Sequence, residues 1–172
     1  MDDRFLGESR NKVDGKGRVS IPVKFRRVLQ NCDPRYSEGG QPRLYIVYGN
    51  RSRNYLECLS GEAFDQIDAM IRAQQPGSKL RRALGGIYYN RCDAILLDDS
   101  GRLVLSQAAR EKIGLEDEAV FEGHGEKFHI LKPEASEKAD DDLEALIAEL
   151  AQGDRYFDPL SLAFMDSAPD EA

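Results

Sequence analysis

Residues 14–29 read DGKGRVSIPVKFRRVL, and residues 98–113, which begin 84 positions later, read DDSGRLVLSQAAREKI. An aspartate, a glycine, an arginine, two apolar positions and a later arginine coincide in the two stretches. Self-similarity at a fixed offset indicates a repeated structural unit, so we expect two copies of one unit in this chain. Whatever Arg18 does in the first copy, Arg102 is placed to do in the second.

Both copies predict the same order of elements: a hairpin, a short helix, two strands and a further helix. The later elements of the first copy fall within residues 44–71, and those of the second within residues 119–147. The second copy is about 11 residues shorter before its last strand, which makes residues 35–43 an extra loop of the first copy. The expected fold is mainly β with short helices, an α+β class.

The start of each copy predicts two strands joined by a tight turn. Apolar residues alternate with polar ones around the turn, and Gly15 and Gly17 supply the backbone freedom that tight loops need. Asp14 and Arg18 flank the first turn and can pair across it, which would fix the shape of the loop. Asp98 and Arg102 have the same spacing of four, so we prefer Asp98 to Asp99 as the second turn-structuring residue.

A helix is expected after each hairpin. Pro22 suits a first helical position, because its missing N–H is not needed there. Val28 and Leu29, with either Val23 or Phe25, would form the apolar side, and the cations Lys24, Arg26 and Arg27 would point elsewhere. In the second copy Ser106 is the expected N-cap, and Gly114 is expected to end the helix.

The charge is distributed unevenly along the 172 residues. Residues 1–91 hold 17 basic and 10 acidic side chains, whereas residues 92–172 hold 7 and 21, within a net charge of −7. A basic first half indicates a polyanionic partner; the alternative is an ordinary solvated surface with uneven charge. The chain has no apolar run near 18 residues and no signal-peptide pattern at its start. With three cysteines and no C-x-x-C, we expect a cytoplasmic protein with reduced thiols and no contact with membranes.

The first copy resembles the AbrB/SpoVT family of bacterial DNA-binding domains. The similarity rests on Lys12-Val-Asp-Gly-Lys-Gly-Arg-Val-Ser-Ile-Pro22, followed by Arg26-Arg27. Two tandem copies, with L-S-G-E-A-F at residues 59–64, resemble the MraZ subgroup of that family. The resemblance covers residues 7–150 and implies AbrB-like units at 7–75 and 76–152, with an acidic variable tail at 153–172.

The resemblance implies a swapped-hairpin β-barrel with peripheral helices, in which the two copies of one chain supply both halves. It also implies a nucleoid-associated transcription regulator that represses its own division and cell-wall operon by binding direct repeats in double-stranded promoter DNA. Several protomers are expected to form a homo-oligomeric ring. The alternative is an antitoxin-like protein-interaction module that uses the acidic C-terminal half, although a full second copy counts against it.

The DNA-contacting positions of the family fall on Lys12, Arg18, Arg26 and Arg27. Physical reasoning adds three more cations near the hairpin and helix and the repeat partner of Arg18, namely Arg10, Lys16, Lys24 and Arg102. An arginine on a rigid hairpin can donate two parallel hydrogen bonds to guanine, and the surrounding cations would bind phosphates. The alternatives are that Arg18 only closes its turn, and that the other cations are solvated surface charges.

The second copy departs from this pattern. Leu96 and Leu97 precede its turn, so the basic residue that Lys12 supplies in the first copy is missing. Ser100 replaces Lys16, and Arg110-Glu111 replaces the arginine pair. Only Arg102 and Arg110 persist as cations, so the second copy either contacts DNA weakly or mainly completes the barrel.

Other chemistry is not indicated. The G-K-G-R run is followed by a strand and is not a nucleotide-binding loop. His124 and His129 lack cysteines or carboxylates at metal spacing in the sequence, so no metal site is expected. No catalytic constellation can be assembled, and we expect no enzyme activity, no cofactor and no small-molecule substrate.

The acidic C-terminal region contains one helical pattern. Its apolar positions are Ala139, Leu143, Leu146, Ile147 and Leu150, and acidic residues cover the other face. We favour packing of this helix on the barrel, with a contact between protomers of a ring as the alternative.

Overall fold

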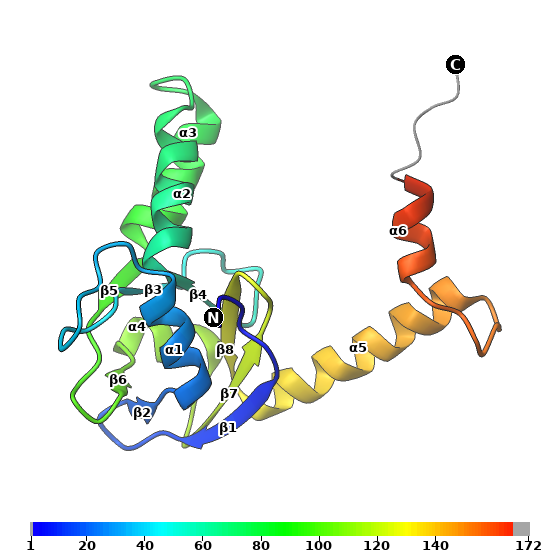
Figure 1. Ribbon diagram of the computed structural model, residues 1–172, viewed down its shortest axis with the longest axis horizontal. Coiled ribbons are helices and arrows are strands. Elements are labelled where there is room, and N and C mark those ends of the chain that lie inside the picture. Colours follow the sequence, from blue (N-terminus) through cyan, green and yellow to red (C-terminus); the bar gives the residue numbers. More distant parts are fainter. Residues whose placement is uncertain (1, 167–172) are drawn as a thin grey trace. The chain divides into compact units, whose positions relative to one another are not determined.

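The computed structural model describes residues 2–166, which form two compact units (Figure 1). The first unit ends at Ala135 and contains the whole first copy of the repeat and the second copy up to its last strand. The second unit starts at Ser136.

The order of elements expected from the repeat is confirmed. The first copy contains β1 (Glu8–Lys12), β2 (Arg18–Ser20), α1 (Val23–Asn31), β3 (Leu44–Val47), β4 (Leu56–Ser60) and α2 (Gly61–Arg72). The second contains β5 (Cys92–Ile95), β6 (Arg102–Val104), α4 (Gln107–Ile113), β7 (Glu118–Gly123), β8 (Lys127–Leu131) and α5 (Pro133–Ala151). Two elements that the sequence reading did not expect lie between the copies, namely α3 (Lys79–Gly85) and a π-helical turn η1 (Gly86–Asn90).

The strands of the two copies pair with each other. A six-stranded antiparallel sheet has the order β1-β7-β8-β4-β3-β5, and β2 pairs with β6 in a separate two-stranded ribbon. Figure 1 shows β1 and β7, which are far apart in the sequence, side by side. The expected turn between β1 and β2 is present, but each of its two strands finds its partner in the other copy. Among the described strands, β1 and β5 are the edges of the large sheet, so hydrogen bonding does not close it into a barrel.

One hydrophobic core serves both copies. The rings of Phe5, Phe25 and Phe128 lie 4.9 to 5.3 Å apart between centroids, which joins the N-terminal segment, α1 and β8. The inward side chains of the small ribbon, Val19 and Leu103, are buried in the same cluster. Because neither copy buries these residues alone, the two copies depend on each other for stability.

The helix boundaries differ from expectation in one detail. Pro22 occupies the N-cap position and α1 starts at Val23, one residue later than expected. Val23 is exposed, so Phe25 is the residue that joins Val28 and Leu29 on the buried side. In the second copy the Ser106 hydroxyl accepts a hydrogen bond from the Ala109 N–H at 3.2 Å, and Gly114 ends the helix with a φ of 62°. Both capping predictions are confirmed.

Ionic contacts fix the extra loop of the first copy. Asp33, at the end of α1, is buried, and its carboxylate accepts hydrogen bonds from the Arg43 backbone N–H at 2.8 Å and from Arg43 Nε at 2.9 Å. The two terminal nitrogens of Arg43 donate to Asp65 on α2 at 3.0 Å. Arg43 therefore ties the loop to two helices at once.

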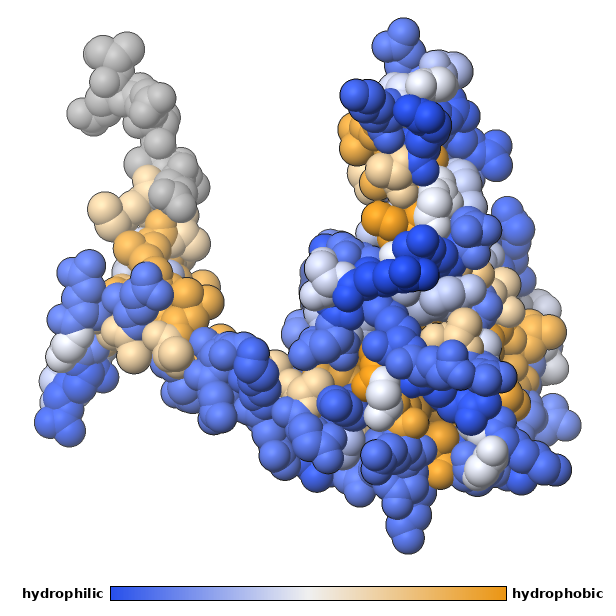
Figure 2. All heavy atoms as spheres, turned by 180° about the vertical axis from the view of Figure 1, so that it is seen from behind, coloured by the Kyte–Doolittle hydropathy of each residue, from blue (hydrophilic) through white to orange (hydrophobic). Residues whose placement is uncertain are grey.

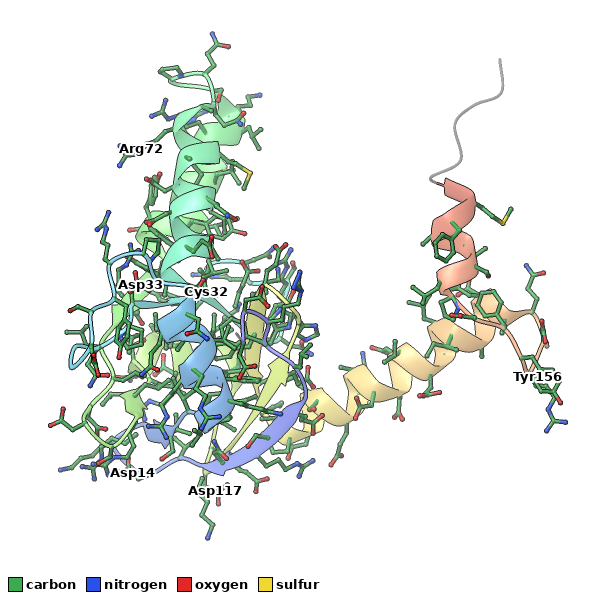
Figure 3. All side chains as sticks on the ribbon, in the orientation of Figure 1. Asp14, Cys32, Asp33, Arg72, Asp117 and Tyr156 are labelled. Carbon is green, nitrogen blue, oxygen red and sulfur yellow. The ribbon has the colours of Figure 1, made fainter. Side chains whose placement is uncertain are left out.

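Helices α2 and α3 form a pair that projects from one end of the first unit (Figure 1). Ser78 caps α3 by accepting from the Arg81 N–H at 3.1 Å. The Tyr89 hydroxyl, on η1, donates to Asp68 of α2 at 2.5 Å. The pair lies at the end of the unit opposite to the turn that carries Asp14 (Figure 3).

The second unit consists of most of α5 and of α6 (Leu160–Asp166). The helical pattern expected at residues 139–150 is confirmed by α5, but Leu143, Leu146 and Leu150 are exposed. Exposed apolar side chains also gather on α6 (Figure 2). No helix among residues 2–166 is long and apolar enough to cross a membrane.

Candidate nucleic-acid interface

The two turns of the repeat have the same hydrogen bonds. Asp14 accepts from the backbone N–H groups of Lys16 and Arg18 at 2.9 Å and from Arg18 Nε at 2.6 Å. Asp98 accepts from the N–H groups of Ser100 and Arg102 at 2.9 Å and from Arg102 Nε at 3.0 Å. The predicted turn-structuring roles of both aspartates agree with this geometry.

These hydrogen bonds favour the charged form of each aspartate. The backbone N–H and side chain of Arg18 lower the pKa of Asp14 to about 2. The backbone N–H of Arg102 is the main cause of the lowered pKa of Asp98. Both ion pairs are therefore intact at neutral pH, and each arginine is held in one orientation.

The ribbon formed by β2 and β6 presents both arginines on one face. Its register sets Arg18 opposite Val104, and Ser20 opposite Arg102. The central pair, Val19 and Leu103, points into the core. Because side chains alternate along a strand, Arg18 and Arg102 lie on the outer face. Their side chains are 42% and 43% exposed.

An arginine from each helix covers the glycine turn of the other copy. Arg26, on α1, lies against Gly101, and Arg110, on α4, lies against Gly17. Arg110 Nε also donates to the Leu105 carbonyl at 3.2 Å. Backbone hydrogen bonds run in the same reciprocal way, from Leu105 to the Gly17 carbonyl at 2.8 Å and from Ile21 to the Gly101 carbonyl at 3.1 Å. The two turns are thus locked together, and Arg26 is partly committed to this contact.

The other predicted cations lie at varying distances from the turns along the chain. Lys12 and Lys16 are exposed, at the end of β1 and in the first turn, and Arg27 is exposed on α1. Arg10, also on β1, contacts Glu118 of β7 at 3.4 Å. Lys24 lies against Gly7, away from either turn.

The structure therefore brings Arg18, Arg102, Arg26 and Lys16 together around the interlocked turns, and it places Lys24 elsewhere. Three residues outside the predicted DNA-binding set also belong to this region: Ser20 and Val104 on the outer face, and Arg110 over Gly17. The repeat offset identified Arg110 as a cation that matches Arg26. Alternation with Val19 pointed to an outward Ser20, whereas the place of Val104 opposite Arg18 depends on which strands pair.

The chemistry of this surface suits a nucleic acid. A two-stranded antiparallel ribbon fits the major groove of B-DNA. Because the ion pair with Asp14 uses Nε of Arg18, both terminal guanidinium nitrogens can donate elsewhere. Parallel donors of this kind match the acceptor pairs of guanine and the oxygens of phosphate.

Comparison with known proteins identifies relatives over the whole chain. No protein-family model matches the chain. A protein of Ruegeria sp. (strain TM1040) named transcriptional regulator MraZ is 46% identical over 169 residues, which cover 98% of each chain. A protein of the same name from Ruegeria pomeroyi is 44% identical over 168 residues, again 98% of each chain. Another from Cereibacter sphaeroides is 41% identical over 139 residues, which are 77% of this chain and 82% of that one. The doubled Asp-Gly-Arg turn and these relatives together place the chain in the MraZ family of transcriptional regulators.

Proposed function

We propose that this protein binds double-stranded DNA sequence-specifically through the β2–β6 ribbon and thereby regulates transcription. The observation that carries the proposal is the pair of pinned arginines, Arg18 and Arg102, on the outer face of one ribbon. Holding a long side chain in one orientation lowers the entropy lost when it binds. The names of the relatives support the same conclusion.

Within this interface the cations have different tasks. Arg18 and Arg102 contact base edges, which specifies the sequence. Lys16 and Arg26, beside the turns, and Lys12 and Arg27, exposed nearby, bind phosphates and set the register. Arg10 and Lys24 contribute to the general positive potential.

The proposal extends to architecture and regulation. Residues 7–75 and 76–152 act as two equivalent units of a swapped-hairpin barrel, which the exchange of strand partners between the copies supports. Several protomers form a ring that binds direct repeats in the promoter of its own division and cell-wall operon and represses it. The protein acts in the cytoplasm at the nucleoid, has no catalytic role, and needs no small-molecule substrate.

Fluorescence anisotropy with full-length protein tests the DNA-binding proposal. The probes are a duplex from upstream of its own gene and a scrambled duplex of equal length, each titrated at several salt concentrations. We expect the promoter to be preferred by about 10³-fold or more. Arg18→Ala should weaken promoter binding by about 1–3 kcal/mol and reduce the preference. Lys16→Ala should weaken binding to both duplexes and reduce the salt slope by about 1.

Arg72→Ala is the matched control. Arg72 is paired with Asp68 four residues away, as Arg18 is with Asp14, but it lies at the opposite end of the unit (Figure 3). It should bind both duplexes as the wild type does. Equal binding of the wild type to the two duplexes would contradict the proposal and favour a protein-interaction module. An equal loss of promoter affinity in Arg18→Ala and Arg72→Ala would contradict the proposed role of the β2–β6 ribbon. Native mass spectrometry would test the ring separately.

A further inference from the structure

A cluster of metal-binding side chains lies on β7 and β8, in a part of the molecule that the proposed DNA interface does not use. Glu122 on β7 lies directly opposite His129 on β8, and His124 follows at the end of β7. One ligand atom from each residue lies within 4.8 Å of those of the other two. His124 Nε2 lies 3.5 Å from a carboxylate oxygen of Glu122. The two imidazole rings are 4.0 Å apart between centroids.

His129 is unusual because it is a buried polar group without a complete set of partners. The residue is only 9% exposed, and its Nε2 has no hydrogen-bond partner among the described residues. A buried nitrogen of this kind calls for an explanation, since burial without a partner costs free energy. Its ring also stacks on Tyr55, with centroids 3.8 Å apart and planes 11° from parallel, so its position is fixed.

We propose that Glu122, His124 and His129 bind one divalent transition-metal ion, with zinc(II) as the ion that best fits the donors. Two imidazoles and one carboxylate are a recurrent zinc ligand set, with a fourth position open to water. Ligand atoms about 2 Å from a tetrahedral zinc lie ~3.3 Å apart. The ligand atoms here lie within 4.8 Å of one another, so they have to approach slightly to bind one ion. The His124 side chain can make this movement, because it is 44% exposed at the end of a strand.

The charges around the cluster are compatible with a cation. Lys127 and Arg53 lie nearby, but both are paired with Glu57, at 3.2 and 3.1 Å. Glu57 is buried on β4, in register with His129, and it offsets part of their positive charge. Glu122 then supplies the negative charge for the metal itself. A bound ion would join the end of β7 to β8 and stabilise this part of the sheet by mass action.

Titration of tag-free, full-length protein with cobalt(II) tests the proposal, because four-coordinate cobalt(II) absorbs visible light and reports its ligands. We expect one ion per chain, a spectrum of nitrogen and oxygen donors, and displacement by zinc(II). His124→Ala and Glu122→Gln should each weaken binding by more than ~100-fold, which exceeds the ~10–100-fold loss expected for an outer-shell partner. Both side chains are at least partly exposed, so the variants should fold, and thermal unfolding without metal checks this.

Glu126→Gln is the matched control. Glu126 is an exposed carboxylate on the same β7–β8 connection, outside the cluster. It should leave the affinity for cobalt(II) unchanged. The proposal is overturned if the wild type gives no four-coordinate spectrum, or if His124→Ala binds as tightly as the wild type. Intense thiolate-to-cobalt absorption would also overturn it, because it would place the ion on Cys32, Cys58 or Cys92.

Discussion

Replacing Gly17 with alanine should destabilise the protein far more than replacing Gly15, two residues earlier in the same turn. Gly17 has a φ of 81°, and an added Cβ would lie 2.7 Å from the Leu105 carbonyl oxygen of the other copy. Gly15 has no positive φ and nothing within 4 Å of such an atom. The comparison therefore measures the combined cost of a left-handed alanine and of the close contact between the two turns.

The expected magnitude follows from two costs. A left-handed conformation costs a non-glycine residue about 1–2 kcal/mol. Moving the backbone away from the clash also weakens the hydrogen bond from the Leu105 N–H to the Gly17 carbonyl, now 2.8 Å long, which contributes about 1 kcal/mol. Gly17→Ala should therefore lower the free energy of unfolding by about 2–3 kcal/mol, and Tm by about 4–12 °C. Gly15→Ala should be neutral or stabilise by about 0.4–1 kcal/mol.

Equilibrium unfolding in urea, followed by circular dichroism, gives both free energies. Equal urea midpoints for the two variants would refute the reasoning, since they would mean that the first turn is not held against the second copy. The slope of the transition should be the same for both variants and the wild type, because the comparison of free energies requires two-state unfolding.

Three further predictions concern the core, the loop and a cap. Phe128→Ala should cost about 3–5 kcal/mol in urea unfolding, because its ring packs on three other buried phenylalanines; a loss below about 1 kcal/mol would contradict one shared core. Burial raises the pKa of Asp33, but hydrogen bonds from Arg43 outweigh it and the net pKa is lowered. The charged Asp33 carboxylate therefore makes its full contribution to the free energy of unfolding above the unfolded pKa near 3.9. This contribution disappears as pH falls through the lower folded pKa. Asp33→Asn should accordingly cost about 3 kcal/mol at pH 7 and less below pH ~4, and a constant difference across this range would contradict the assignment. Ser106→Ala should cost about 1 kcal/mol through loss of the α4 cap, measured by the same unfolding assay; an unchanged midpoint would refute the cap.

Local features of the fold could be predicted because they depend on residues close together in the sequence. The Asp14–Arg18 pair spans four residues, and the turn bonds it makes are all within that span. The Asp98 carboxylate accepts the corresponding bonds from Arg102, again four residues away. Helix caps such as Ser106 also act within one turn of helix.

Strand pairing could not be predicted from the same patterns. Alternation around Val19 indicates which side of a strand is buried, but it does not name the neighbouring strand. In the folded chain β1 pairs with β7, and β2 pairs with β6, so the two strands that flank one turn belong to different sheets. Only that pairing sets Val104 beside Arg18 on the outer face.

The grouping of the two histidines also depends on strand pairing. Glu122 and His124 are two residues apart in the sequence, but only the antiparallel register sets His129 directly opposite Glu122. Helix α3 could not be predicted, because its short run between Ser78 and the π-helical turn has no clear apolar period.

The exchange of strands between the copies imposes an order on biosynthesis. Arg10 and its contact Glu118 are 108 residues apart. During synthesis β1 therefore cannot pair with β7 until most of the chain has been translated. At ordinary rates of translation this wait lasts roughly 5–20 s. During that time the inner faces of β2 and α1, including Val19 and Phe25, leave the ribosome without the second copy that will cover them. A truncated messenger RNA that encodes only the first copy would yield a protein that cannot bury these residues. Such a fragment would not fold, and it would not compete with the full-length protein.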